Sequence, residues 1–438
     1  MDEAAPHILA IVTVRLDDRS RQRYSLAWSG APPHLAAPGD GAWRALGVAM
    51  AEGRIIGALP GPRARPGDAP TAVLVCRPSA AFVDLVPAGV GELAGMPERD
   101  LGADQSHTSV VLGERILLKV YRRLQPGLNP DLEMTAFLSE EVGFSAVPRL
   151  AGFAELVEAR HGTTTIAMAQ EFVADGADAF ESIADALVGW LSAPGAVSLE
   201  HATDIAADLG TLTAGLHAAV ADGHGLPEME PRPATRSEIR AWARDAREHL
   251  DAALDVTPGD AGRTLKALAP RIAESLTVLD ALSSAPDVVR AHGDYHLGQV
   301  LIAPDGFRII DFEGEPGVPV EARRAHRPAL RDVASMLRSL DHVGRSAGRR
   351  AVEANGGPLE RPGLDLDGWQ RRARERFLEA YAEGLKEARI WPDLDPSLLR
   401  AFEIDKELGE FVYAATYLPS WLYAPTEGMA GLFADEPE

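Results

Sequence analysis

The segment VVRAHGDYHLGQVLIAPDGFRIIDFEGEP, residues 288–316, holds the polar side chains whose spacing best fits a chemical task. Asp294 ends a His-Gly-Asp turn after a short apolar strand, and Gln299 follows five residues later. Two apolar runs then flank Pro304-Asp305-Gly306, a hairpin signal that would return Asp311 toward the start of the segment. The three side chains should therefore gather at one end of a small sheet.

Two carboxylates and an amide in this order suit phosphoryl transfer. Asp294 would orient an attacking hydroxyl and accept its proton, while Gln299 and Asp311 would hold Mg²⁺ against the phosphates. The spacing matches the kinase catalytic loop H-x-D-x-x-x-x-N with Gln in place of Asn, and Asp-Phe-Glu at 311–313 stands where kinases carry D-F-G. The alternative is a surface turn and a hairpin with incidental acids, which the combined spacing argues against.

Lysine is scarce in this chain, since the 43 basic residues include only Lys119, Lys266, Lys386 and Lys406. Lys119 lies within the apolar run RILLKVY, where burial of an unpaired cation would be costly. Glu133, in the next predicted helix, can supply the anion, as in the Lys–Glu pair that positions the phosphates in kinases. The alternative is a solvent-facing lysine on an edge strand.

Two further segments could contact a nucleotide, although no G-x-G-x-x-G motif covers the phosphates. In GADQSHTSVVLG, backbone amides could bind phosphate together with the hydroxyls of Ser106, Thr108 and Ser109; the alternative is an ordinary polar hairpin loop. The segment AMAQEFVADG follows a strand and precedes the helical part, as the adenine-binding hinge does in kinases. The predicted hinge contacts are Gln170, Glu171 and Val173.

The pattern of apolar residues changes along the chain and predicts an α+β fold. Residues 1–95 favour short strands, and residues 96–175 favour the order strand, strand, helix, strand. Gly113 and Glu114 are the hairpin signal between the first two of these strands, and Asn129 or Asp131 would cap the helix. Residues 176–438 are mainly helical, with a loop expected at 344–365 and a frayed acidic tail at 424–438. The predicted helices of this part span 177–193, 199–221, 235–254, 262–284, 329–343, 366–388 and 396–416.

Composition limits the class of protein. The 438 residues are 46% apolar and 25% charged, which allows a buried core and two to four folded units. A net charge of −22 repels phosphate backbones, so we expect neither nucleic acid nor membrane as a partner. One cysteine, Cys76, excludes an internal disulfide and a thiolate metal cage. The N-terminus lacks the basic start of a signal peptide, and no stretch of about 18 apolar residues could span a bilayer. We therefore expect a soluble, cytoplasmic protein.

The sequence resembles the maltokinase-like branch of the aminoglycoside phosphotransferase, or protein-kinase-like, superfamily over most of its length. The resemblance implies a bilobal protein-kinase-like fold with an N-terminal cap domain over 1–95, an N-lobe over 96–175 and a helical C-lobe over 176–438. It also implies ATP and Mg²⁺ as cofactors, a sugar acceptor, and Asp332 as a structural acid that braces the catalytic turn. The motifs that carry it are DQSHTS, ILLKVYRRL, NPDLE, QEFV, HGDYHLGQVL, IIDFEGEP, ALRDVASMLRSLDH and EIDKELGEFVYAATYLPSWL.

Two departures from typical maltokinases concern the substrate. QSHTS replaces their QSNTS, and YAATYLPSWLYAP replaces their YE followed by RPxWLPIPL, in a region that lies by the acceptor sugar in such enzymes. The variation resembles an actinobacterial group of glucosamine kinases built on the same scaffold. The predicted acceptor contacts are Asp294, His296, Asp405, Glu410, Tyr417 and Trp421. Two of these, Asp405 and Glu410, also have counterparts in maltokinases.

The helix at 396–416 supports an amino sugar by charge. Glu403, Glu407 and Glu410 lie largely on one helical face and could attract a sugar ammonium, while Tyr417 and Trp421 could stack on a pyranose ring. Loss of a buried ion-pair partner costs about 3–5 kcal/mol, enough to select a charged sugar. The alternatives are a solvated acidic face and a tryptophan that only packs.

We therefore predict a monomeric, ATP- and Mg²⁺-dependent kinase that acts on glucosamine and yields glucosamine 6-phosphate. The alternatives are maltose, yielding maltose 1-phosphate, and aminoglycoside antibiotics. A non-catalytic nucleotide-binding module is the competing class, although degenerate kinases usually lose the lysine, the base or the metal-binding aspartate, and all three are present here.

Overall fold

The structure, a computed structural model, consists of two compact units. Unit 1 comprises residues 1–176 and 303–324, and unit 2 comprises 177–302 and 325–438. The expected division at residues 95 and 175 stays a prediction. None of the described helices is long and apolar enough to cross a membrane. The residues that the structure describes are 7–58, 72–101, 107–192, 198–282, 285–314, 318–354, 356, 366–390 and 394–434.

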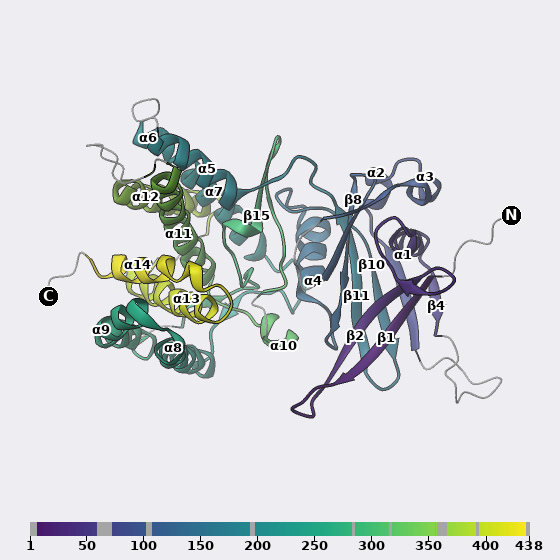
Figure 1. Ribbon diagram of the computed structural model, residues 1–438, viewed down its shortest axis with the longest axis horizontal. Coiled ribbons are helices and arrows are strands. Elements are labelled where there is room, and N and C mark those ends of the chain that lie inside the picture. Colours follow the sequence, from purple (N-terminus) through teal and green to yellow (C-terminus); the bar gives the residue numbers. More distant parts are fainter. Residues whose placement is uncertain are drawn as a thin grey trace. The chain divides into compact units, whose positions relative to one another are not determined.

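A sheet of seven strands in the described part of the chain forms the centre of unit 1 (Figure 1). Its order is β4-β5-β10-β11-β8-β7-β6, so strands from before residue 95 pair with strands from after it. Val110, Leu118 and Ile166 are fully buried and contribute to its core. The strands are β4 (Ile55–Gly57), β5 (Ala72–Pro78), β6 (Glu98–Asp100), β7 (His107–Leu112), β8 (Ile116–Tyr121), β10 (Leu150–Glu158) and β11 (Gly162–Glu171).

The β7–β8 hairpin confirms its sequence signal. The last paired residues are Leu112 and Ile116, so Gly113, Glu114 and Arg115 form the loop. Gly113 and Glu114 have φ of 59° and 54°, a left-handed geometry that glycine adopts readily. Ser109 pairs with Lys119 across the two strands. The next helix, α4 (Pro130–Ala136), begins where Asn129 accepts a hydrogen bond from the Asp131 amide, as a helix N-cap does. The hairpin and the helix together place Lys119 beside the first turn of α4.

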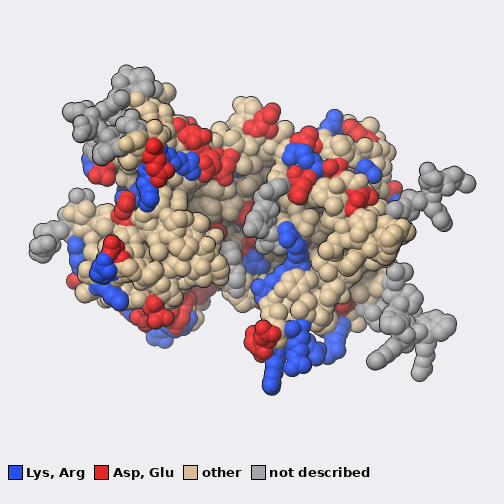
Figure 2. Space-filling view, viewed as in Figure 1, with Lys and Arg blue, Asp and Glu red and all other residues tan. Residues whose placement is uncertain are grey.

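A smaller sheet forms the other layer of unit 1. It contains β1 (His7–Arg15), β2 (Arg21–Ser29), β3 (His34–Leu35) and β9 (Arg123–Leu124). Figure 2 shows basic side chains gathered near the tip of the β1–β2 hairpin, where Arg15, Arg19 and Arg21 are exposed. The net negative charge is therefore not spread evenly over the surface. The remaining elements of unit 1 are α1 (Ala42–Ala51), α2 (Phe82–Leu85), α3 (Val90–Gly95), η1 (Phe137–Val142), β16 (Gly306–Ile309) and α10 (Val320–Arg323).

Unit 2 is mainly helical. Helices α7 (Asp204–Val220) and α12 (Leu366–Glu387) approach closely because Gly210 and Gly384 present no side chain at their contact. The other helices are α5 (Ala179–Ser192), α6 (Leu199–Ala202), α8 (Arg236–Val256), α9 (Gly259–Leu276), η2 (Thr277–Leu279), η3 (Leu297–Gln299), α11 (Leu330–Ala354), α13 (Pro396–Tyr417), η4 (Pro419–Trp421) and α14 (Tyr423–Leu432). The short strands are β12 (Ala177–Asp178), β13 (Arg232–Pro233), β14 (Asp287–Val288) and β15 (Val300–Ala303).

Two expectations about this part were wrong. Helix α11 continues past residue 343 to Ala354, because Ala347 and Ala351 continue its buried face. The tail is not frayed from residue 424, because α14 buries Met429 and is followed by the buried ring of Phe433.

Candidate active site

The turn at residues 292–294 of unit 2, the predicted catalytic turn, is held by one buried acid. Asp332, 1% exposed, accepts hydrogen bonds from the backbone amides of His292 (2.8 Å) and Gly293 (3.1 Å). Burial alone would raise the pKa of Asp332, but His217 and the His292 amide outweigh it and hold the pKa below its ordinary value. Gly293 has φ of 86°, which lets the chain turn sharply before Asp294. The structure thus gives Asp332 contacts suited to the bracing role that the resemblance implied.

We expect Asp332→Ala to destabilise the protein, because it leaves the His292 and Gly293 amides buried without an acceptor. Each such amide costs about 1–3 kcal/mol. Urea unfolding measures the loss, and Asp332→Asn, which keeps one acceptor oxygen, should lose less. Equal stability of Asp332→Ala and the unchanged protein would contradict the bracing role.

Asp294 forms an ion pair that the sequence did not reveal. Lys406 Nζ, from α13, lies 3.2 Å from Asp294 Oδ1 and 3.2 Å from Glu410 Oε1. His296 Nε2 lies 3.8 Å from Asp294 Oδ2. Burial alone would raise the pKa of Asp294, but the charge of Lys406 and then the nearby imidazole of His296 hold it well below its ordinary value. The predicted base is therefore ionised, and two predicted acceptor contacts, His296 and Glu410, lie around it.

The other acids of α13 face inward. Glu403 and Glu407 are fully buried, so the alternative of a solvated face is wrong for them. Arg374 binds both carboxylate oxygens of Glu403, and His342 Nε2 lies 3.0 Å from Glu407 Oε1. These pairs compensate the cost of burying the charges.

Asp405 is also enclosed. It is 4% exposed, and its carboxylate contacts His249 Nδ1 (2.7 Å) and Arg331 Nη1 (3.0 Å). Contact between Asp405 and the acceptor stays a prediction, but these partners favour a structural role instead.

The two predicted aromatic contacts differ in their surroundings. Tyr417 is 74% exposed, and its ring lies 5.4 Å from that of Tyr413. Trp421 contacts the rings of Phe180, His342 and Tyr423 at centroid distances of 5.9, 6.1 and 5.4 Å. Trp421 therefore packs on its neighbours while it remains partly exposed.

Lys119 has an anionic partner in unit 1, but the expected partner was wrong. Its Nζ lies 2.8 Å from Asp131 Oδ2 and 3.8 Å from Asp311 Oδ1. Glu133 instead accepts hydrogen bonds from Nε (2.8 Å) and Nη2 of Arg324. Asp131 and Glu133 stand two positions apart on α4 and so point in different directions, and only Asp131 faces β8.

Asp131 also connects the lysine to the predicted metal loop. Its Oδ1 accepts a hydrogen bond from the Phe312 amide at 3.0 Å, directly after Asp311. Burial alone would lower the pKa of Lys119, but Asp131 and Asp311 outweigh it and raise the pKa. Asp311 has φ of 65°, which is uncommon for a residue other than glycine, and this conformation is held by contacts of the loop with α4.

The surroundings of Asp311 fit a divalent cation. Carboxylate oxygens of Asp131, Asp311 and Glu313 lie within 4.8 Å of one another. The two carboxylate oxygens of Asp131 already accept hydrogen bonds, one from Lys119 and one from the Phe312 amide. By contrast, Glu313 Oε1 is buried without a hydrogen-bond partner among the described residues. Burial and then the charges of Asp311 and Asp131 raise the pKa of Glu313 to about 7. A hard cation held by Asp311 and Glu313 would relieve that repulsion.

The predicted nucleotide contacts lie on β7 and at the end of β11. Thr108 and Ser109 are in β7, whereas Ser106 lies outside the described residues. Gln170 is buried, and Arg149 binds both carboxylate oxygens of Glu171, each at 3.0 Å. The amides of Glu171 and Phe172 donate to the protein backbone, and the Val173 carbonyl accepts from the Gly176 amide. Contact of this segment with a base stays a prediction.

Gln299 ends the short helix η3 and donates its amide to the His296 carbonyl at 2.9 Å. Gln299 and Asp294 belong to unit 2, whereas Asp311 and Lys119 belong to unit 1. The structure brings together Asp294, His296 and Glu410 in one group and Lys119 and Asp311 in another. That both groups serve one nucleotide stays a prediction.

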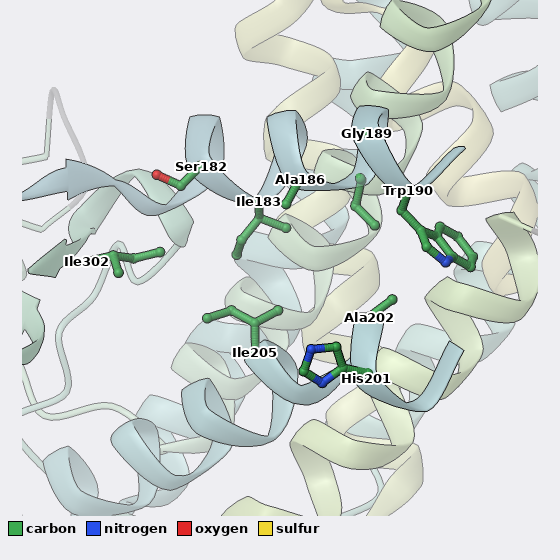
Figure 3. Close-up of a pocket in the computed structure, with 10 residues that line it drawn as sticks. Ser182, Ile183, Ala186, Gly189, Trp190, His201, Ala202, Ile205 and Ile302 are labelled. Atoms are coloured by element: carbon green, nitrogen blue, oxygen red, sulfur yellow. The ribbon is translucent and has the colours of Figure 1, made fainter. Parts of the chain in front are cut away.

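Unit 2 also has an apolar cavity of about 520 Å³ between α5, α6, α7 and β15 (Figure 3). Its lining includes Trp190, His201 and Ile302, and none of the predicted site residues. The volume of this cavity therefore does not identify it as the active site.

Comparison with known families decides the assignment. Residues 98–396, more than half of the chain, match the family described as "Phosphotransferase enzyme family". The chain belongs to this phosphotransferase family. The match includes Lys119, the catalytic turn and Asp311, so the residues singled out for phosphoryl transfer lie within the family domain.

Individual members of the phosphotransferase family are similar over most of their length. A glucosamine kinase of Streptacidiphilus jiangxiensis is 34% identical over 85% of this chain and 83% of its own. A glucosamine kinase of Mycolicibacterium smegmatis is 32% identical over 76% of this chain and 79% of its own. A solved glucosamine kinase in complex with glucosamine, ADP and inorganic phosphate has a TM-score of 0.75 and 30% identity, covering 98% and 92% of the two chains. The protein-kinase-like α+β fold expected from the sequence is therefore confirmed.

Proposed function

We propose that this phosphotransferase is a glucosamine kinase, which transfers the γ-phosphoryl group of ATP to glucosamine. The observation that carries the proposal is the similarity, over most of the chain, to two glucosamine kinases and to a solved enzyme with glucosamine and ADP bound. The geometry around Asp294 supports it, because an ionised carboxylate lies beside a partly open acid, Glu410, on α13.

The reaction we propose is a direct displacement. Asp294 accepts a hydrogen bond from the sugar hydroxyl and takes its proton as the oxygen attacks the γ-phosphorus. The bond between the γ-phosphorus and the bridging oxygen breaks, and ADP leaves. The products are ADP and glucosamine phosphate, which we propose to be the 6-phosphate. Closure of the site around the substrates would exclude water and limit wasteful ATP hydrolysis.

The nucleotide and metal contacts are part of the proposal. Lys119, held by Asp131, would bind the phosphates, with Thr108 and Ser109 on the neighbouring strand. Asp311 and Glu313 offer the carboxylates for Mg²⁺, and Gln299 would complete the site as the sequence predicts. The bound ion would neutralise charge on the phosphates during transfer.

The acceptor site would be formed by α13, the turn that holds Asp294 and His296, and the short helix η4. Glu410 would bind the sugar ammonium, and His296 and Trp421 would contact the ring. A cytoplasmic, monomeric enzyme, as expected from the sequence, completes the proposal, and size-exclusion chromatography tests the oligomeric state.

We expect ADP release to depend on both Mg²⁺ and glucosamine. The test measures ADP with ATP and a panel of glucosamine, glucose, maltose and an aminoglycoside, each with Mg²⁺ and with EDTA. Glucosamine should stimulate release most, and EDTA should abolish it. A protein that binds ATP but shows no sugar-stimulated release would be a non-catalytic module, and preferred stimulation by maltose would make it a maltokinase.

A further inference from the structure

Helix α13 carries several charged side chains, and Lys406 and Glu410 are two that remain partly exposed. The side chains of Lys406, Asp294 and Glu410 are 29%, 18% and 23% exposed. By contrast, Glu403, Asp405 and Glu407 are at most 4% exposed and have basic partners from other helices. A ligand can therefore reach the Asp294–Lys406–Glu410 group but not the acids next to it.

One ammonium group serves two carboxylates in this group. Lys406 Nζ is 3.2 Å from an oxygen of each, and Glu410 is one helical turn from Lys406 on α13. Asp294 comes from the catalytic turn, 112 residues away in the sequence. Lys406 thus links the base to the acid that we assign to the acceptor.

We propose that Lys406 is a positioning residue of the transfer reaction, which keeps Asp294 ionised and oriented and shares Glu410 with the ammonium group of the acceptor. The inference rests on the proposed function. A sugar ammonium that binds Glu410 competes with Lys406 for that carboxylate. Lys406 then interacts with Asp294 alone, so binding of the acceptor strengthens the ion pair between Lys406 and Asp294.

The effects of other charged groups around Asp294 must be distinguished from the effect of Lys406. His296 and His292 lie on the same turn as Asp294, and His342 of α11 acts on Glu410. Each of these groups can also influence the kinetics of the enzyme. They are present in every variant compared below, so only the difference between profiles reports on Lys406.

The test compares Lys406→Met with Lys406→Arg, using glucosamine as acceptor between about pH 5 and about pH 9. Without the cation, burial and Glu410 should raise the pKa of Asp294 into the tested range, so that kcat/KM of Lys406→Met acquires an acid limb that the unchanged enzyme lacks. At low pH the Met variant should therefore lose kcat, whereas KM for glucosamine should fall because Glu410 no longer has a competitor. The Arg variant keeps the charge and should restore the original profile.

The control is Lys386→Met, because that lysine is 58% exposed and pairs only with Glu383 on its own helix among the described residues. It should match the unchanged enzyme. An identical pH profile for Lys406→Met, or a higher KM with unchanged kcat, would overturn the inference. If the unchanged enzyme itself shows no glucosamine-stimulated ADP release, the proposed function fails instead. Circular dichroism confirms that each variant is folded.

Discussion

Asp294→Asn is expected to reduce kcat for glucosamine phosphorylation by about 10²–10⁴-fold, because the amide cannot accept the proton of the attacking hydroxyl. The asparagine side chain has nearly the same size as aspartate, and its carbonyl oxygen can still accept a hydrogen bond from Lys406. The fold should therefore survive, with an unchanged melting temperature. Steady-state ADP release with saturating ATP and glucosamine measures the effect.

Asp185→Asn is a matched control for Asp294, since Asp185 lies on α5 of the same unit with 80% of its side chain exposed. It should have full activity. Turnover of Asp294→Asn at the level of this control would remove Asp294 from the mechanism, and loss of structure in Asp294→Asn would instead indicate that the carboxylate serves the fold.

Asp131→Ala is expected to lower the free energy of unfolding by about 3–5 kcal/mol, because it leaves the buried ammonium of Lys119 without its nearest anion. It also removes the acceptor of the Phe312 amide beside Asp311. The KM for ATP should rise in the same variant, since Lys119 loses the contact that directs it. Calorimetric unfolding and ATP-dependent kinetics measure the two effects.

A double variant distinguishes the effect of the unpaired Lys119 charge on stability from the effect of lost packing at residue 131. In Lys119→Met/Asp131→Leu no charge of the pair remains, and stability should recover toward the starting value although activity does not. The control is Glu114→Ala, which breaks the exposed pair with Arg99 and should change stability little. If the double variant were no more stable than Asp131→Ala alone, the charge of Lys119 would not be the cause.

Local signals in the sequence predicted most of the elements that position the site. Gly113 and Glu114 predicted the hairpin, and one of the two candidate caps, Asn129, begins α4, because turns and caps depend on a few adjacent residues. The carboxylate at 332 was assigned through a family pattern, and its contacts with the catalytic turn are those of a brace.

Partners that are distant in the sequence could not be predicted in the same way. Two acids, Asp131 and Glu133, lie near Lys119 in sequence, and the choice between them depends on how α4 is rotated against β8. The spacing of Lys406 and Glu410 is visible in the sequence, but the contact with Asp294 depends on how α13 packs on the catalytic turn. Glu403 and Glu407 resemble a solvated face because the arginine and histidine that neutralise them come from other helices.

The order of the seven strands has a consequence for shortened versions of the protein. Strand β5 lies between β4 and β10, and it is antiparallel to both. A chain cut to begin at residue 96 would lose β4 and β5 and would leave residues 152–158 of β10 without their neighbouring strand. Such an edge is a template for intermolecular pairing, so the family domain expressed alone should aggregate unless its missing neighbour is supplied as a separate peptide.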